Sequence, residues 1–143
     1  MVGAELKPVP IEGGRRFLVV FDKRREGMGW RPHHILTSNQ YNHVYLLAEM
    51  GNNKTLLIKP TMKCMHIDTW DCNLALAGEH VKRYGVTCIL DYTCDYEAHE
   101  GYLFRGIYTC VSAVKNFLNI RGAGIVTPRQ LKRKLIKLGA TKF

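Results

Sequence analysis

Two residues in this sequence have the types and surroundings needed for nucleophilic catalysis. Cys110 follows Thr109 and opens a segment in which Val111, Val114 and Leu118 recur at helical spacing. Thr109 is the expected N-cap, so the thiol lies in the first helical turn. The helix dipole and the unpaired backbone N–H groups there favour a thiolate and could form part of an oxyanion hole. His43, which opens an expected strand, is the candidate base.

Each of the two residues also has an ordinary structural interpretation. Unpaired cysteine is among the most buried residue types and often fills a core. A histidine on a strand is often half-buried with a backbone partner. With six histidines and five cysteines, accidental pairs are numerous. The catalytic assignment is therefore a hypothesis about geometry, which the fold must test.

The elements that would position these residues are mostly strands, with helices inserted and appended. We expect strands at 17–21, 43–49, 55–59, 64–67 and 86–92, a hairpin turn at 51–54, and helices at 74–84, from 110 onward and from 127 onward. This order predicts an α+β domain with a mainly antiparallel sheet packed against helices. We expect the domain to span residues 17–143, preceded by an N-terminal arm at residues 1–16.

The last helix has the clearest start signal in the chain. Thr127 is the expected N-cap, Pro128 occupies the first helical position, and Gln130 completes a capping box. Leu131, Leu135 and Leu138 form an apolar stripe at helical spacing, which we expect to pack on the sheet. Gly139 would end the helix.

The charge of the chain is strongly positive and uneven. The formal net charge is +9 over 143 residues, and the segment from Arg129 to the C-terminus contains basic residues and no acidic ones. Such a charge suits nucleic acid, an anionic envelope polymer or an acidic protein, although a solvated helix face is the simpler interpretation. The final helix contains no aromatic platform or known nucleic-acid motif.

Other features limit the function classes. The composition is that of a globular protein, no apolar run approaches a membrane span, and we recognise no signal peptide. Cys64, His66, Cys72, His80, Cys88 and Cys94 are near in sequence, but they lack the short Cys-x-x-Cys spacing typical of zinc sites. We therefore expect no metal and no cofactor, and an odd number of unpaired thiols in a reducing compartment.

Several of these stretches resemble a known superfamily. The strand that begins His43-Val44-Tyr45-Leu46, the hairpin after it and the later Thr109-Cys110-Val111-Ser112 are similar to the circularly permuted NlpC-type branch of papain-like proteins. Small tailed-bacteriophage proteins of this kind are more similar still. They share an early apolar strand, a loop with a tryptophan such as Trp30, and a last helix that opens like Thr127-Pro128-Arg129-Gln130-Leu131. The resemblance covers most of the chain from Phe17 to Leu138.

The resemblance implies a permuted papain-like fold, a nucleophile at Cys110 and a general base at His43. A third polar residue on the next strand would orient the histidine, and here Lys59 occupies that neighbourhood. A charged lysine cannot accept a hydrogen bond from an imidazole N–H. Asn53, Asp68 or a backbone carbonyl would have to act instead, or the site has lost catalysis.

Two functions follow from this resemblance. One is a phage cysteine hydrolase that cleaves an amide bond, for which a peptidoglycan peptide is the candidate substrate. The other is a non-catalytic virion or assembly protein that keeps the fold and binds other virion proteins, or nucleic acid through the basic last helix. Either would reside in the host cytoplasm or in the phage virion. A shared fold does not by itself decide between these functions.

Overall fold

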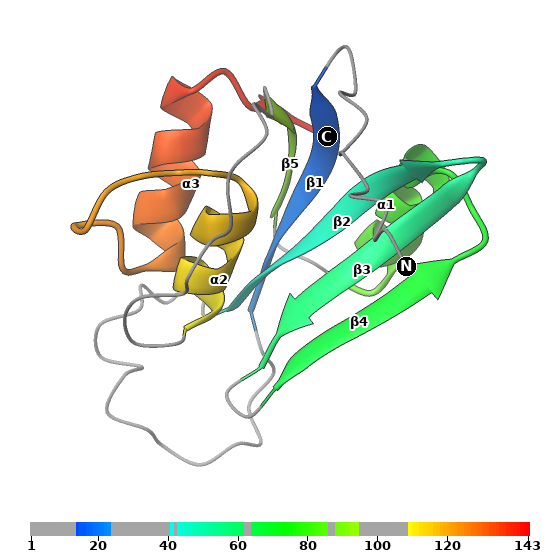
Figure 1. The fold of residues 1–143 in the computed structure, drawn as a ribbon, viewed down its shortest axis with the longest axis horizontal. Coiled ribbons are helices and arrows are strands. Elements are labelled where there is room, and N and C mark those ends of the chain that lie inside the picture. Colours follow the sequence, from blue (N-terminus) through cyan, green and yellow to red (C-terminus); the bar gives the residue numbers. More distant parts are fainter. Residues whose placement is uncertain (1–13, 24–40, 42, 62–63, 86–87, 95–108) are drawn as a thin grey trace, which may run out of the picture.

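The computed structural model describes residues 14–23, 41, 43–61, 64–85, 88–94 and 109–143, which form one sheet with helices on both faces. The elements are β1 (Arg15–Asp22), β2 (His43–Gly51), β3 (Lys54–Pro60), β4 (Met65–Trp70), α1 (Leu74–Arg83), β5 (Cys88–Cys94), α2 (Cys110–Phe117), α3 (Pro128–Lys137) and β6 (Thr141–Lys142). The predicted α+β class, with a sheet packed against helices, is confirmed (Figure 1).

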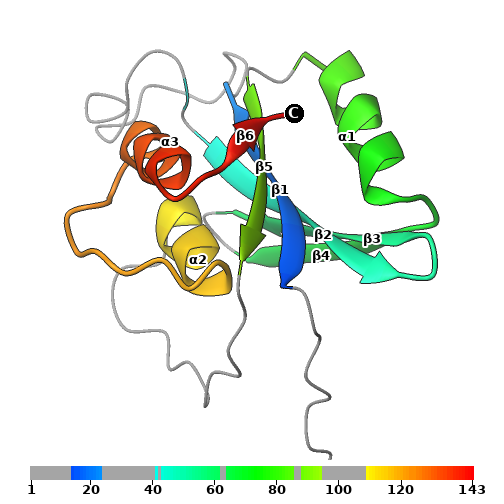
Figure 2. The same cartoon turned by 90° about the horizontal axis from the view of Figure 1, so that it is seen from above.

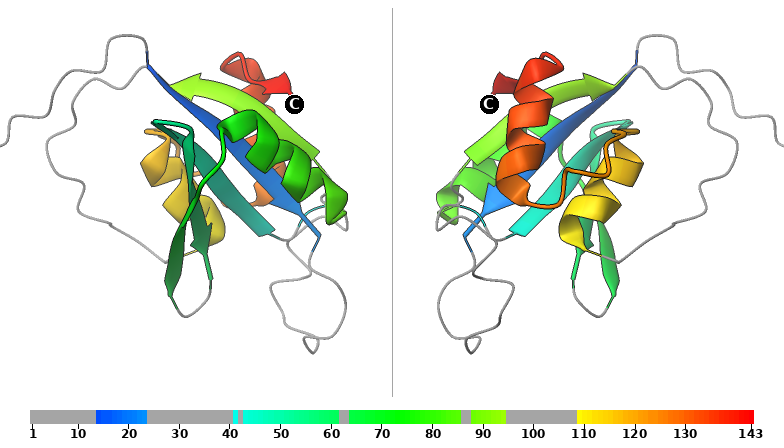
Figure 3. Two further views of the ribbon diagram at one scale, coloured as in Figure 1. Left: turned by 90° about the vertical axis from the view of Figure 1, so that its right-hand side faces the viewer. Right: turned by 90° about the vertical axis from the view of Figure 1, so that its left-hand side faces the viewer.

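The sheet contains all six strands in the order β4-β3-β2-β1-β5-β6, and every neighbouring pair is antiparallel. α1 covers one face of the sheet, and α2 and α3 cover the other (Figures 2 and 3). We call these the α1 face and the α2–α3 face.

The central strand β1 explains why helices lie on both faces. Its residues Leu18 to Phe21 are all fully buried, so alternate side chains need cover on opposite sides. Val19 and Phe21 belong to the core beneath α2 and α3, whereas Leu18 and Val20 belong to the core beneath α1. A continuous apolar run on a strand is the pattern of a sheet covered on both faces.

Local chemistry sets where the helices begin and where the hairpin turns. The side chains of Asn73, Thr109 and Thr127 accept hydrogen bonds from backbone N–H groups in the first turns of α1, α2 and α3. Asn52 and Asn53 have positive φ angles of 50° and 60° in the β2–β3 turn, a conformation that asparagine tolerates better than most residues. The caps predicted at Thr109 and Thr127 and the predicted hairpin are confirmed, whereas the cap at Asn73 was not predicted.

Several boundaries differ from the expectation. The fourth strand runs from Met65 to Trp70 rather than from 64 to 67, and β5 continues to Cys94 rather than ending at 92. Residues 86 and 87, where the fifth strand was expected to begin, lie outside the described residues. The short strand β6 was not predicted, because two residues give no periodic signal. Leu138 is 45% exposed and does not join the buried Leu131 and Leu135, because it follows the last helical residue. The expected arm, except for residues 14–16, and the Trp30 loop lie outside the described residues.

Phe143 packs between β5 and α1. Phe143 donates its backbone N–H to the carbonyl of Ile89 in β5, and the Nζ atom of Lys82 lies 4.5 Å from the centre of its ring. Gly78 of α1 leaves room for that ring. A Cβ atom on Gly78 would lie 2.5 Å from Cε1 of Phe143 and 2.7 Å from Cδ1 of Leu18.

Replacement of Gly78 by alanine should therefore destabilise the protein. The gain in helix propensity is about 1 kcal/mol, but overpacking typically costs about 1–3 kcal/mol. We expect a net loss of about 1 kcal/mol in the free energy of unfolding, measured in urea. The loss should shrink in a Phe143→Ala background, and a Gly78→Ala protein at least as stable as the wild type would contradict the packing described.

Candidate functional site

The start of α2 has the local structure that the sequence predicts. The Oγ1 atom of Thr109 accepts the N–H of Ser112 at 3.0 Å, and the Oγ atom of Ser112 accepts the N–H of Thr109 at 2.8 Å. This reciprocal capping box makes Cys110 the first residue of the helix. Its side chain is half-buried and packs against the core beneath α2 and α3. None of the five cysteines, all of which are described, forms a disulfide.

His43 is buried at the start of β2, with 4% of its surface exposed. In the β1–β2 register it lies opposite Asp22, and Tyr45 lies opposite Val20. The ring centroids of His43 and Tyr45 are 6.0 Å apart, as expected for alternate residues on one face. Because Tyr45 belongs to the core beneath α1, the His43 ring lies on the α1 face.

The structure therefore brings Cys110 and His43 to the same end of the sheet but to different faces of it. The start of α2 lies near the start of β2 in Figures 1 and 2. The β2 side chains on the α2–α3 face are those of Val44, Leu46 and Ala48. Because side chains alternate along a strand, a shift of β2 by one residue would be needed to turn His43 toward α2, and it would turn Val44, Leu46 and Ala48 out of the core beneath α2 and α3. The proposed Cys110–His43 pair stays a prediction, and this alternation weighs against it.

The candidates for orienting His43 lie elsewhere. The Nζ atom of Lys59 is 5.2 Å from the centre of the Tyr45 ring, so this side chain is directed to Tyr45. Asn53 lies in the hairpin beyond the far end of β2. Asp68 of β4 is aligned across the sheet with Leu57 of β3 and Leu47 of β2. Leu47 lies four residues along β2 from His43. Along a strand, four residues span about 14 Å.

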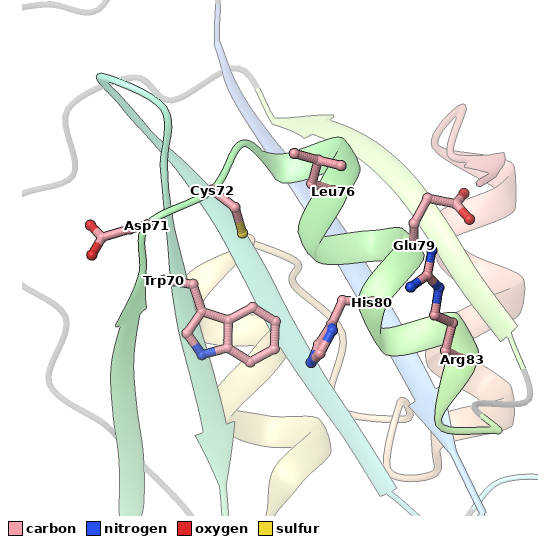
Figure 4. A pocket seen from close by; sticks show the side chains of 7 residues that line it. All are labelled: Trp70, Asp71, Cys72, Leu76, Glu79, His80 and Arg83. Carbon is pink, nitrogen blue, oxygen red and sulfur yellow. The ribbon is translucent and has the colours of Figure 1, made fainter.

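A hollow that the sequence did not predict lies between the end of β4 and α1 (Figure 4). It has a volume of about 550 Å³ and is lined by Trp70, Asp71, Cys72, Leu76, Glu79, His80 and Arg83. The rings of Trp70 and His80 meet edge to face, with centroids 5.6 Å apart. The Oδ1 atom of Asp71 forms an ion pair with the Nζ atom of Lys54 at 3.4 Å. The hollow contains neither Cys110 nor His43, so it is separate from the predicted catalytic pair.

A second hollow, of about 440 Å³, lies at the end of α2 beside the α2–α3 connection. Lys115 forms part of its lining, and its Nζ atom donates to the carbonyl oxygens of Gly122, at 2.5 Å, and Ile125, at 3.1 Å. These bonds fix the connection between the helices. The charge of Lys115 therefore has a structural use within the loop.

The most pronounced electrostatic feature is the layer formed by residues 109–143, which we call the basic layer. It includes α2, α3 and β6, and it contains eight basic residues and no acidic residue. These are Lys115, Arg121, Arg129, Lys132, Arg133, Lys134, Lys137 and Lys142. The remaining 108 residues of the chain therefore have a net charge of only +1, against +9 for the whole.

Within this layer, Arg129, Arg133 and Lys137 are exposed and four residues apart on α3, and we call them the basic stripe. Lys132 differs from them. Its Nζ atom donates to the hydroxyl oxygen of Tyr41 at 2.8 Å and lies 4.8 Å from the centre of that ring. The hydrogen bond from Lys132 to Tyr41 raises the pKa of the Lys132 ammonium. Lys132 thus has a packing role that the stripe residues lack.

Comparison with known proteins gave no relative: no family model, no curated protein and no solved structure matches this chain. In the described part of the chain, no group of three or more histidine, cysteine, aspartate or glutamate side chains is arranged to hold a metal. No helix within those same ranges is long and apolar enough to cross a membrane.

Tyr45 provides a pH-dependent test of the α1 face. Burial raises the pKa of its phenol well above the usual 10.0, and the charge of Asp22 raises it further. A raised pKa in the folded state stabilises the protein below pH 10, and this contribution is lost as the pH rises above 10. Between pH 8 and pH 11, the melting temperature should fall further for the wild type than for Tyr45→Phe. The exposed Tyr84 is the matched control, since Tyr84→Phe should follow the wild type.

Proposed function

We propose that this protein is a non-catalytic phage virion or assembly protein that has a papain-like fold and binds an acidic partner through its basic layer. The phage origin and the papain-like fold rest on the sequence resemblance. The binding role rests on one observation, the concentration of eight basic and no acidic residues in residues 109–143.

The energetics of α3 support a binding role for its charges. Successive like charges at four-residue spacing destabilise a helix by about 0.2–0.5 kcal/mol per pair. The basic stripe contains two such steps, Arg129 to Arg133 and Arg133 to Lys137. Arg129 also lies in the first turn, which contains no acidic residue and where a positive charge opposes the helix dipole. Lys137 lies in the last turn, where a positive charge interacts favourably with the dipole, so the unfavourable part of the stripe is at Arg129 and Arg133. An anionic partner would relieve the repulsion there.

The position of His43 also favours this function over hydrolysis. A catalytic thiol needs a base within hydrogen-bond reach. His43 shares the α1 face with Tyr45, whereas α2 covers the opposite face. Lys59, at the expected third position, cannot orient a histidine by accepting a hydrogen bond.

Hydrolysis by Cys110 is the second candidate function. It is favoured by the capping box at Thr109, which leaves a half-buried thiol at the positive end of α2. A cell-wall peptide is the candidate substrate, because the positive charge of the protein suits an anionic wall.

Neutralising the basic stripe should weaken binding to polyanions. The triple variant Arg129→Gln, Arg133→Gln, Lys137→Gln should bind a short DNA duplex more weakly, with a slope of log K against log salt reduced by about 1 per lost phosphate contact. Fluorescence anisotropy over a salt series measures both quantities. Lys132 is left unchanged because it packs on Tyr41.

A matched control removes the same number of exposed charges elsewhere. The variant Lys23→Gln, Lys54→Gln, Arg83→Gln lowers the net charge equally but lies outside the basic layer. Equal binding and equal salt slopes for the two variants would show that net charge alone matters and would contradict a specific role for α3.

The alkylation rate of Cys110 against pH decides between binding and hydrolysis. For a non-catalytic protein, the pH dependence of the Cys110 reaction should be the same in the wild type and in His43→Ala, because the helix dipole acts on the thiol in both. A fast reaction well below the ordinary thiol pKa of about 8.5 that is lost in His43→Ala would establish a working pair instead. Peptide mass spectrometry assigns the modified cysteine, and Cys110→Ser provides the blank.

A further inference from the structure

The strand β4 forms one edge of the sheet, and most of its residues are exposed. It pairs with β3 on its inner side, and among the residues that the structure describes no strand pairs with its outer side. Residues 66–69 are all exposed, and Ile67 has 58% of its surface accessible. An open edge strand with an exposed apolar residue is a template for pairing with another strand.

The backbone groups that point outward from β4 follow from the turn before it. The N–H of Thr61 donates to the carbonyl of Cys64 at 2.8 Å, so these two residues form a hydrogen-bonded pair. Hydrogen-bonded and non-hydrogen-bonded pairs alternate along an antiparallel ladder. The register therefore makes Lys59–His66 and Leu57–Asp68 hydrogen-bonded pairs, and it leaves the N–H and C=O of Ile67 directed outward.

A side-chain contact agrees with this direction. The N–H of Thr69, two residues after Ile67, donates to the Oδ1 atom of Asp68 at 2.8 Å. Alternate residues on a strand present their backbone groups to the same side. Thr69 and Ile67 thus both direct their N–H groups to the outer edge.

We propose that the outer edge of β4 is a homodimer interface, in which two copies pair antiparallel about a two-fold axis at Ile67. Ile67 would exchange two backbone hydrogen bonds with the partner's Ile67. On the α1 face, His66 would lie directly opposite the partner's Asp68, and Asp68 opposite the partner's His66. Both of these side chains are exposed and on the same face as Leu57 of β3.

The segment His66-Ile67-Asp68 is complementary to a second copy of itself, which favours a homodimer over another partner. A two-fold interface brings each residue against a fixed counterpart, and here it pairs histidine with aspartate twice and isoleucine with isoleucine once. A foreign strand would need the same pattern by coincidence. The interface lies on the edge opposite β6, so it leaves the basic layer accessible and is independent of the proposed binding function.

Exchange of the side chains at positions 66 and 68 tests the pairing of His66 with the partner's Asp68. Sedimentation velocity over a concentration series should show a reversible dimer for the wild type. His66→Asp places two carboxylates opposite each other at both ends of the interface and should weaken dimerisation by about 10-fold or more. The double variant His66→Asp, Asp68→His again places a histidine opposite an aspartate at both ends of the interface and should dimerise like the wild type.

Engineered cysteines test the register. Directly opposed residues in a hydrogen-bonded pair have Cα atoms about 5.5 Å apart, within the range for a disulfide. Mild oxidation should therefore link two copies of Ile67→Cys through the introduced thiol, as mapped by peptide mass spectrometry. Thr69→Cys is the control, because the two copies of that position would be about 14 Å apart along the strands.

The outcomes separate clearly. A wild type that stays monomeric at all concentrations overturns the proposal, as does a dimer that the single variant His66→Asp leaves unchanged. Equal cross-linking of Ile67→Cys and Thr69→Cys also overturns it. Circular dichroism of each variant ensures that a loss of dimer is not a loss of fold.

Discussion

The fold depends on the burial of β1 on both of its faces. From Leu18 to Phe21 every side chain is inaccessible to solvent, and successive side chains enter different cores. Such a strand is stable only if helices cover both faces of the sheet. α1 provides one cover, and α2 with α3 provides the other. The assignment of every functional side chain to a face follows from its position relative to this strand.

That constraint separates the two residues whose chemistry first attracts attention. Thr109 and Ser112 place Cys110 at the head of α2, while the alternation of β2 directs Val44 and Leu46 to the same helix and His43 to the other face. A helix dipole can lower the pKa of a thiol, but it cannot accept the proton during the reaction. The proposed binding function therefore places the chemistry of this protein in the charges of α3.

Charge and core are segregated in the C-terminal third of the chain. Leu131 and Leu135 are fully buried beneath α3, while Arg129, Arg133 and Lys137 lie on its exposed side. Lys115 and Lys132, although equally basic in sequence, are held by loop carbonyls and by Tyr41. Counting basic residues therefore overstates the surface available to a partner, and the hydrogen bonds show which cations remain for it.

The sequence by itself determined the local elements: the caps at Thr109 and Thr127, the Asn52–Asn53 turn, the strands of the first hairpin and the basic last helix. These depend on neighbours within a few residues, so propensity and periodicity are sufficient. The face on which His43 lies was decided only by the tertiary structure. From Val44 to Leu47 the run is apolar at every position, so the sequence contains no alternation from which a face could be assigned. The open edge of β4 was likewise decided by strand order, which depends on contacts between residues far apart in the chain.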